Sequence, residues 1–403
     1  MIFQTLDDKS SCVGIYANKN LYFDIKEFPM GLEATWSPSS HLRDKDIEYA
    51  SLYLEGRSVD PLLPEYLKDD WNDVTNKLRS FRRSLMISKI DMGQNCFYDL
   101  VPKRFLIEYC EIKNKITSYV LEKIERPSRY EFYKSLGLML EDISNRRVNI
   151  DRRKVASLVG SSKWSNHAER LLKNSPYINY NQFGTKTGRL TTKSKTFPIL
   201  TLPSDLKKFV VPTNDLFVEL DFNGAEVRVL LGLGGFDQPE VDVHSYHAHK
   251  FLGSSSLRAK AKVDFFSWLY GSKSKNIKEI SDLLEKDYNK ESLLQKFYQD
   301  NTVRTIYNKV IKDVSPHHAL NYIIQSTSAD LTLKQALKMD FLIREKSSSS
   351  FIFGIVHDSV ILDMKKEDLF LLPSLKYLMS STEFGSFRIN ARAGKNLLEM
   401  KNI

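Results

Sequence analysis

The sequence lacks the features of secreted and membrane-anchored proteins. Its 403 residues include only three cysteines, Cys12, Cys96 and Cys110, with no CxxC spacing. This pattern indicates neither a disulfide framework nor a zinc site, so we expect a reducing cytoplasm. The first residues, MIFQTLDDKSS, lack the basic and then apolar order of a signal peptide. No apolar run approaches the roughly 20 residues of a membrane helix, which predicts a soluble intracellular protein.

What the chain does have is ordinary globular composition and a surplus of positive charge. Hydrophobic residues make up 42% of the sequence, which excludes a disordered chain, and the length predicts two or three domains. Lys and Arg number 59 and Asp and Glu 50, giving a formal net charge of +9. A surplus of this size suits a polyanionic partner, but it also occurs in proteins that bind no nucleic acid.

Hydrophobic periodicity predicts a mainly helical first part and a mixed second part. In the first part we expect two short strands around a turn at 18–20, helices over 41–59, 65–90, 105–124 and 130–143, and a loop over 161–187. In the second part we expect strands over 216–221, 351–356 and 360–364, helices over 224–235, 255–270 and 319–340, and a final helix with a short terminal segment. The charged, helix-prone segment 272–310 has no role that the sequence assigns.

Two aspartates occupy positions where strands end. Asp221 ends the first strand of the second part, and Asp358 lies in the turn between the other two. Neighbouring carboxylates of this kind can hold two divalent metal ions about 4 Å apart for phosphoryl transfer. Carboxylate and carbonyl oxygens are also the ligands that magnesium prefers. An aspartate at a strand end or turn, taken alone, is more often a plain cap, so the prediction depends on the surrounding motifs.

The helix expected over 255–270 has cationic and aromatic residues along one face. Arg258, Lys262, Phe266 and Tyr270 follow one another at intervals of four residues, along about 18 Å of helix. Cations at one end suit a triphosphate, and aromatic rings at the other suit a base. The alternative is an amphipathic helix with its aromatics in the core and its cations in solvent.

Six short motifs follow one another along the second part. They are TGRL (187–190), DFNGAEVR (221–228), DVH (242–244), RAKAKVDFFSWLYG (258–271), the Asn321 and Gln325 pair in NYIIQSTSAD, and VHDS (356–359). In content and order this set resembles the polymerase region of the family A (DNA polymerase I-like) DNA polymerases. The stretch SPHHALNYIIQS (315–326) is most similar to phage-type members.

The resemblance implies a role for each matching residue. Asp221 and Asp358, with the Phe222 carbonyl, would bind two Mg²⁺ ions, for which Mn²⁺ could substitute, and Lys262 would be the acid that protonates pyrophosphate. Glu226 would exclude a ribose 2′-hydroxyl. The residues implied for dNTP binding are Arg258, Lys262, Phe266, Tyr270, His244 and Glu226, and those implied for primer–template DNA are Arg189, Asn321, Gln325 and His357.

Some positions depart from the family pattern. Ser359 stands where a second carboxylate is usual, which weakens one accessory interaction but not metal binding itself. His317 stands where an arginine is common. Asn223, Gly224 and Ala225 replace bulkier residues, which leaves the shape of the pocket and the fidelity of copying open.

The resemblance implies an α+β right-hand polymerase with an antiparallel palm sheet, helical fingers and a reduced helical thumb. The stretch 130–151 resembles the helix that begins the polymerase region, and the interval from there to Thr187 is short for a thumb. Either the thumb is shortened or upstream helices replace it. The expected divisions are 1–125 for an amino-terminal region, 126–186 for the thumb, 187–235 and 341–403 for the palm, and 236–340 for the fingers.

Residues 1–125 carry traces similar to a proofreading nuclease. Gln4 and Leu6 stand where such nucleases have acids, and Lys113, four residues after Tyr109, replaces another acid. Asn95–Asp99 resembles a middle motif but lies too close to Tyr109. A degenerate nuclease remnant and an unrelated origin both stay open, and proofreading activity is not expected.

The function implied by the resemblance is DNA-directed DNA polymerisation in DNA replication. The expected partners are primer–template DNA, dNTPs and replication accessory proteins, with no membrane, for a monomer in bacterial or phage-infected cytoplasm. One alternative is a single-subunit RNA polymerase, against which Glu226 and Phe266 argue. The other is an inactive subunit that only holds primer–template, against which Asp221, Asp358 and Lys262 argue.

Overall fold

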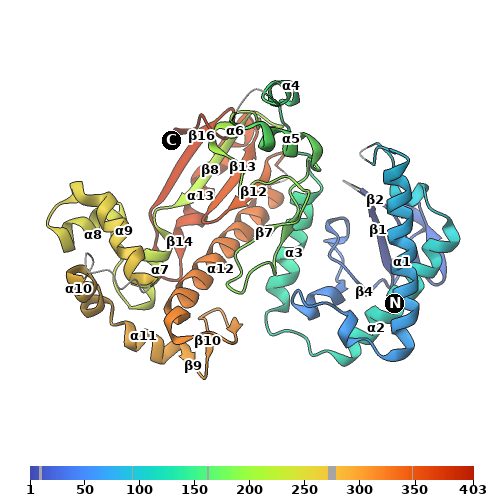
Figure 1. The fold of residues 1–403 in the computed structure, drawn as a ribbon, viewed down its shortest axis with the longest axis horizontal. Coiled ribbons are helices and arrows are strands. Elements are labelled where there is room, and N and C mark those ends of the chain that lie inside the picture. The colour runs from blue at the N-terminus through green and yellow to red at the C-terminus, as the bar shows by residue number, and fades with distance from the viewer. Residues whose placement is uncertain (9–10, 93, 161–162, 271–277, 347) are drawn as a thin grey trace. The chain divides into compact units, whose positions relative to one another are not determined.

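The computed structural model describes residues 1–403 except 9–10, 93, 161–162, 271–277 and 347. The chain divides into two compact units, Met1–Arg146 and Arg147–Ile403 (Figure 1). The division falls within 126–186, so helix α3 (Tyr130–Ser144) belongs to the first unit. Among the described residues, no helix has the length and apolar character to span a membrane.

The first unit combines a small antiparallel sheet with long helices. Residues Leu6, Tyr16 and Cys110 form a buried cluster between the sheet and α2. The predicted turn is confirmed, because Asn18 and Lys19 both adopt positive φ between β2 and β3. The helices predicted over 65–90, 105–124 and 130–143 are also confirmed. The elements are β1 (Gln4–Asp8), β2 (Ser11–Ala17), β3 (Asn20–Tyr22), α1 (Glu65–Ile87), α2 (Lys103–Lys123) and α3.

The helix predicted over 41–59 is wrong. That segment forms short 3₁₀ turns, Ser40–Leu42 and Ala50–Leu54, and strand β5 (Glu48–Tyr49), which pairs in parallel with β4 (Ala34–Thr35). Leu52, Tyr53 and Leu54 are consecutive and all buried. A surface helix buries one face only, so a run buried on every side favours irregular packing. Further 3₁₀ turns are Ile25–Glu27, Asp60–Leu62 and Phe97–Asp99.

The second unit is built around a five-stranded antiparallel sheet. Its strand order is β12-β13-β8-β16-β17, and the long helix α12 and helix α13 pack against it (Figure 1). The three predicted strands are confirmed. Strands β16 and β17, which the last residues of the chain form, were not predicted. Strand β16 is partly exposed along its length and shows no clear alternation. The strands are β8 (Leu216–Phe222), β12 (Phe351–Val356), β13 (Ser359–Met364), β16 (Ile389–Gly394) and β17 (Lys401–Asn402), and the helices are α12 (Pro316–Glu345) and α13 (Leu372–Ser380).

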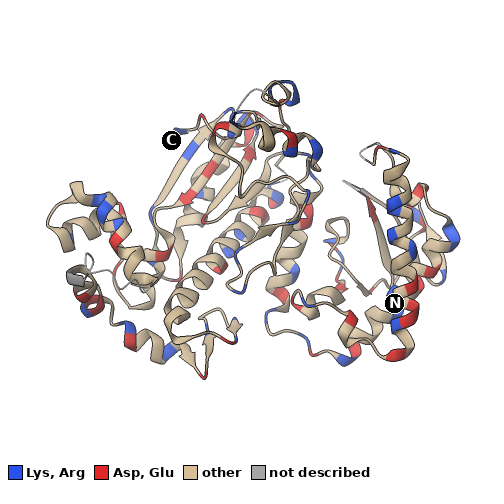
Figure 2. Ribbon diagram, in the orientation of Figure 1, with Lys and Arg blue, Asp and Glu red and all other residues tan. Residues whose placement is uncertain are grey.

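Helices and small sheets complete the second unit. The helix predicted over 255–270 begins with a 3₁₀ turn and becomes α-helical at Arg258, and Lys and Arg colour its first turns in Figure 2. The loop predicted over 161–187 is wrong in part, because Ala168 and Leu171 are buried on a short helix. These elements are α4 (Arg152–Ala156), α5 (Ser165–Lys173), β6 (Tyr180–Asn181), β7 (Thr191–Thr192), α6 (Ser204–Lys207), α7 (Ala225–Leu233), α8 (Val243–Leu252), α9 (Arg258–Leu269), α10 (Lys278–Tyr288), α11 (Lys290–Phe297), β9 (Tyr298–Gln299), β10 (Thr302–Arg304), β11 (Val310–Ile311), the 3₁₀ turn Lys366–Leu371, β14 (Ser381–Thr382) and β15 (Gly385–Ser386).

A buried histidine joins three of these helices. His247 of α8 is 1% exposed, and its Nε2 lies 2.6 Å from the hydroxyl of Tyr288 on α10. Its ring centroid lies 5.2 Å from that of Phe265 on α9. Burial lowers the pKa of His247 to about 3; the positive charge of Lys250 acts in the same direction, and Asp287 opposes it. The folded protein therefore holds this imidazole neutral.

We predict that His247 makes the protein sensitive to acid. Between its usual pKa of 6.5 and its folded pKa of about 3, the unfolded chain binds a proton that the folded protein does not. Stability should fall as pH falls through this window, by up to about 1.4 kcal/mol per pH unit. The measurement is Tm between pH 7 and pH 5. His247→Gln should flatten the decline, and His249→Gln, at an exposed position on the same helix, should keep the wild-type slope.

Candidate active site

Strand register brings the two predicted aspartates together. Asp221 lies on central strand β8, opposite Ser359 of β13 on one side and Asn390 of β16 on the other. Asp358 directly precedes Ser359, in the tight turn after β12, and its carbonyl accepts a hydrogen bond from the Phe222 amide at 3.4 Å. Both carboxylates therefore lie at the same end of the sheet.

The turn that leaves this strand end needs a glycine. Gly224 has φ +70°, and a Cβ there would lie 2.5 Å from Cγ1 of Val243. The residue is therefore required both by backbone conformation and by close packing against the start of α8. Its small size, a departure from the family pattern, lets the chain turn directly from Asp221 into α7.

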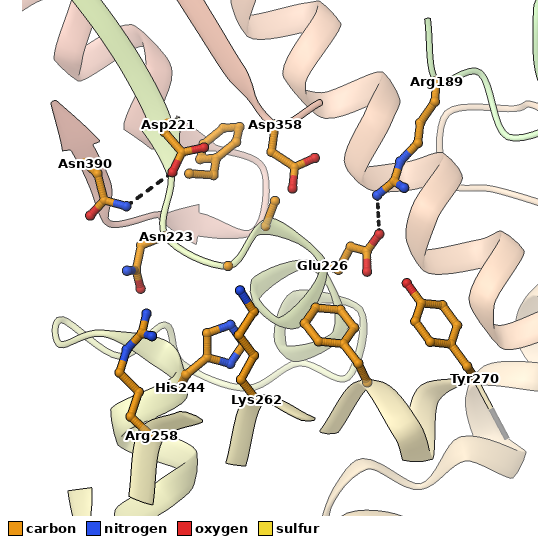
Figure 3. Close-up of a pocket in the computed structure, with 14 residues that line it drawn as sticks. Arg189, Asp221, Asn223, Glu226, His244, Arg258, Lys262, Tyr270, Asp358 and Asn390 are labelled. Atoms are coloured by element: carbon orange, nitrogen blue, oxygen red, sulfur yellow. Dashed lines mark hydrogen bonds and ion pairs between the residues drawn. The ribbon is translucent and has the colours of Figure 1, made fainter. Parts of the chain in front are cut away.

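A cavity of about 430 Å³ opens beside this strand end. Figure 3 shows the Asp221 and Asp358 carboxylates on its upper side and Arg258, Lys262 and Tyr270 on the opposite side. Most of the residues that the resemblance implied line it, namely Arg189, Asp221, Phe222, Glu226, His244, Arg258, Lys262, Phe266, Tyr270 and Asp358. Asn223, Gly224, Ala225 and Asn390 complete the lining.

The face of α9 that carries the four spaced residues is turned to the cavity. Arg258, Lys262, Phe266 and Tyr270 all line it. The buried core side of the helix is formed by other residues, namely Ala261, Asp264, Phe265, Trp268 and Leu269. The rings of Phe266 and Tyr270 are stacked, with centroids 5.9 Å apart and planes at 21°. The alternative, in which these two aromatics belong to the core, is therefore wrong.

Nearby positive charge compensates the two aspartates only in part: Arg392 lowers the pKa of Asp221, and Arg189 and His357 lower that of Asp358. Burial raises the pKa of Asp221 to about 6, against a hydrogen bond from Asn390, while Glu219 and Asp358 raise it further. Burial also raises the pKa of Asp358. Within the described residues, neither forms an ion pair with a Lys or Arg side chain. A divalent cation would supply the missing charge.

The donor set fits magnesium. In the described part of the chain, no group of three or more His, Cys, Asp or Glu side chains is arranged to hold a metal by itself. Magnesium is typically held by one or two carboxylates together with water and substrate phosphates. Asp221, Asp358 and the Phe222 carbonyl would thus leave coordination positions for phosphate oxygens.

Glu226 is held at the wall of the cavity. It lies on the first turn of α7 and is 4% exposed. Nη2 of Arg189 donates to its Oε1, and the nearby Tyr270 hydroxyl favours the ionised form of the same carboxylate. Burial raises its pKa, and the charge of Arg189 opposes that shift. The carboxylate is therefore fixed between two other predicted site residues.

His244 is buried between the cations and Phe266. Burial and the nearby Lys262 charge lower its pKa to about 4, so the ring is neutral near pH 7. Its Nδ1 is buried with no hydrogen-bond partner among the described residues. A neutral imidazole can donate one hydrogen bond to an anion without adding charge.

Three predicted DNA-binding residues lie outside this cavity. The Gln325 Oε1 accepts a hydrogen bond from Thr187 Oγ1 at 2.8 Å, which joins α12 to the TGRL segment. Asn321 lies one turn earlier on the same face of α12. His357 is exposed in the turn between β12 and β13, where it lines a much smaller cavity with Arg189.

Sequence reasoning missed three polar residues of this region. Asn390 comes from β16, a strand that carries no motif, and donates to Asp221 at 3.3 Å. Asn223 was noted only for its size, although its side chain bonds Asp242 at 2.7 Å. Asp242 was noted only as part of a motif, yet it pairs with Arg258 through two hydrogen bonds. Asn223 and Asp242 both stood in motifs of the sequence, whereas no motif covered Asn390, and the helix that follows Asp242 was not predicted.

Comparison with solved structures shows the fold of a polymerase domain. The chain is similar to the POL domain of Pol1 from M. smegmatis in complex with DNA primer-template and dNTP, with a TM-score of 0.65 and 10% identity. The match covers 98% of this chain and 95% of that one. At this identity the likeness concerns the fold. No protein-family model matches the chain.

Two curated proteins give the relationship in sequence. The DNA polymerase I of Aquifex aeolicus (strain VF5) is 23% identical over 265 residues, covering 56% of this chain and 45% of that protein. The DNA polymerase I of Lactococcus lactis subsp. cremoris (strain MG1363) is 23% identical over 239 residues, covering 48% and 27%. The chain thus spans less than half of either relative. It is a distant relative of DNA polymerase I.

The first unit contains a separate cavity of about 170 Å³. Gln4, Leu6, Tyr109 and Lys113, the positions similar to nuclease motifs, all line it. The described residues that line it include no Asp or Glu; the lining is completed by Thr5, Leu78, Arg82, Phe97, Tyr98, Phe105, Leu106 and Cys110. A two-metal nuclease needs carboxylate ligands, and this cavity offers none.

We predict that the protein does not degrade single-stranded DNA from its 3′ end. The measurement is release of mononucleotides from a labelled oligonucleotide in Mg²⁺ or Mn²⁺. Trace release that persists in Asp99→Ala would indicate a contaminant. Steady release that Asp99→Ala abolishes would contradict the prediction.

Proposed function

We propose that the protein is a template-directed DNA polymerase that joins a dNTP to a primer 3′-hydroxyl, without proofreading. The observation that carries the proposal is the 430 Å³ cavity. The Asp221 and Asp358 carboxylates lie on one side, and Arg258, Lys262 and Tyr270 lie on the other (Figure 3). This arrangement suits a nucleotide whose triphosphate lies between metal ions and cations and whose base meets aromatic rings.

The reaction is attack of the primer 3′-oxygen on the α-phosphorus of the dNTP. The new O–P bond forms as the bond to the β,γ-pyrophosphate breaks. Two Mg²⁺ ions bound by Asp221, Asp358 and the Phe222 carbonyl would activate the 3′-hydroxyl and stabilise charge on the phosphates.

Side chains of the protein bind the nucleotide and donate the proton that the reaction needs. Arg258 and Lys262 bind the triphosphate oxygens, and Lys262 donates a proton to the departing pyrophosphate. His244 donates a hydrogen bond to a phosphate. Phe266 stacks on the incoming base, and Tyr270 closes the pocket near the templating base.

DNA contacts complete the proposal. Arg189, Asn321 and Gln325 contact the minor groove, where acceptor positions are shared by all correct base pairs, and His357 lies at the primer end. The sheet region, 187–235 and 341–403, serves as palm and 236–340 as fingers. Residues 126–186 serve as a reduced thumb, and 1–125 as a further region. The protein works as a cytoplasmic monomer with replication accessory proteins, in a phage-type role.

We predict that Asp221→Asn or Asp358→Asn abolishes primer extension. Each change keeps the size of the side chain but removes a metal ligand, so the rate should fall by at least about 10³-fold. Primer–template affinity, measured by fluorescence anisotropy, should stay within a few-fold. Asp205→Asn, at a surface carboxylate paired with Lys163, is the matched control. More than a tenth of the wild-type rate in either site variant would refute the metal assignment.

Wild-type activity also separates the two alternatives. Extension with dNTPs excludes an inactive subunit that only holds primer–template. Extension with NTPs in preference to dNTPs would instead favour a single-subunit RNA polymerase. One assay run with each set of nucleotides distinguishes all three.

We predict that Glu226 selects the sugar by occupying space. Glu226→Ala should raise incorporation of CTP relative to dCTP, because the carboxylate stem no longer meets the 2′-hydroxyl. A thousandfold selection corresponds to about 4 kcal/mol. Single-turnover kcat/KM for both nucleotides on one template gives the ratio. Glu226→Gln, which keeps the stem and the volume, should retain most of the selection. An unchanged ratio in Glu226→Ala would show that Glu226 does not select the sugar.

A further inference from the structure

Asp242 stands at the junction of three segments that line the cavity. It precedes α8, and its Oδ1 accepts hydrogen bonds from the Ser245 amide at 2.8 Å and the Ser245 hydroxyl at 3.1 Å. Its Oδ2 accepts from Asn223 Nδ2 at 2.7 Å. One carboxylate therefore caps α8 and holds the turn that follows Asp221.

The same carboxylate also holds Arg258, the first residue of α9. Nε of Arg258 lies 2.9 Å from Oδ1, and Nη2 lies 2.9 Å from Oδ2. This is the paired, side-on geometry in which a guanidinium meets both oxygens of a carboxylate. Asp242 remains ionised, because hydrogen bonds from Arg258, Asn223 and Ser245 outweigh the opposing effect of burial and hold its pKa below the usual range.

The pairing uses only one edge of the guanidinium. An arginine has five N–H donors in a planar fork, and Asp242 accepts from Nε and from one side of Nη2. Nη1 and the other side of Nη2 have no partner among the described residues, and Arg258 lines the cavity. The free edge is therefore available to phosphate oxygens while the opposite edge stays fixed.

Asn223 connects this pair to the metal-ligand strand. It lies two residues after Asp221, and its Oδ1 accepts from the Val243 amide at 2.9 Å. Fully buried Arg228 donates to the Asn223 carbonyl at 2.8 Å and to the Val241 carbonyl at 3.0 Å. These bonds hold the turn against the chain that leads into Asp242. Figure 3 shows Asn223 and Arg258 next to each other on one side of the cavity.

We propose that Asp242 is a positioning residue, which orients Arg258 toward the triphosphate and fixes its place relative to Asp221 through Asn223. This inference rests on the proposed function and adds a residue to it. The Asp242 carboxylate acts on the nucleotide through the guanidinium. Its removal should weaken dNTP binding more than it slows the chemical step.

The test compares Asp242→Asn with wild type in single-nucleotide incorporation at saturating primer–template. Losing the charged pair should raise KM for the dNTP about tenfold, while kcat stays within about threefold and primer–template affinity is unchanged. Asp264→Asn is the matched control, because Asp264 is a buried acid of α9 paired with Lys260 at 2.7 Å but does not line the cavity. Its KM should remain at the wild-type value.

A double-mutant cycle separates positioning from general support of the fold. In an Arg258→Ala background, Asp242→Asn should raise KM no further, because its effect runs through Arg258. Additive effects, with kcat and DNA affinity reduced alike, would overturn the proposal. A fall in KM would also overturn it, since the carboxylate would then compete with the triphosphate for Arg258.

A second variant covers the case in which Asp242→Asn does not fold. Arg258→Lys keeps the charge but cannot form the side-on pair, so it should raise KM for the dNTP with little change in kcat. An unchanged KM in this variant would overturn the proposal. Failure of the wild-type protein to extend primers would instead refute the proposed function itself.

Discussion

The site depends on the register of three antiparallel strands. Pairing of β13, β8 and β16 sets Ser359 and Asn390 on either side of Asp221 and brings the Asp358 turn to the same end of the sheet. A slip of one residue would turn Asp221 to the opposite face. Buried Phe217, Val218 and Leu220 on β8 oppose such a slip, so the apolar core of the sheet holds Asp221 and Asp358 at the same end.

This geometry brings three carboxylates together at positions where burial disfavours their charged form. The raised pKa values of Asp221, Asp358 and Glu226 share that cause. Opposite them, Arg258 and Lys262 supply positive charge, but Arg258 is already paired with Asp242. Asp221, Asp358 and Lys262 form no ion pair among the described residues, so they remain available to ligands of opposite charge. Groups whose pKa values are shifted by burial and by neighbouring charge cluster at functional sites.

The sequence predicted some elements of each unit well and missed others. Long periodic helices such as α2 and α12, and apolar strands such as β8, have patterns that local rules detect. The same rules wrongly predicted a helix over 41–59, because the apolar residues of this segment pack on all sides in 3₁₀ turns. Strand β16 was not predicted because its side chains are only partly buried. In both cases long-range packing decided the conformation.

The sequence by itself determined which chemistry was available: two strand-end aspartates, a stripe of cations and aromatics every four residues, and motifs in a family order. These follow from residue type and helical or strand period, which are local properties. Only the tertiary structure decided that the stripe faces a cavity, that Arg189 holds Glu226, and that Asp242 holds Arg258. Those contacts join residues distant in sequence or on different elements, and their geometry is set by sheet register and helix packing.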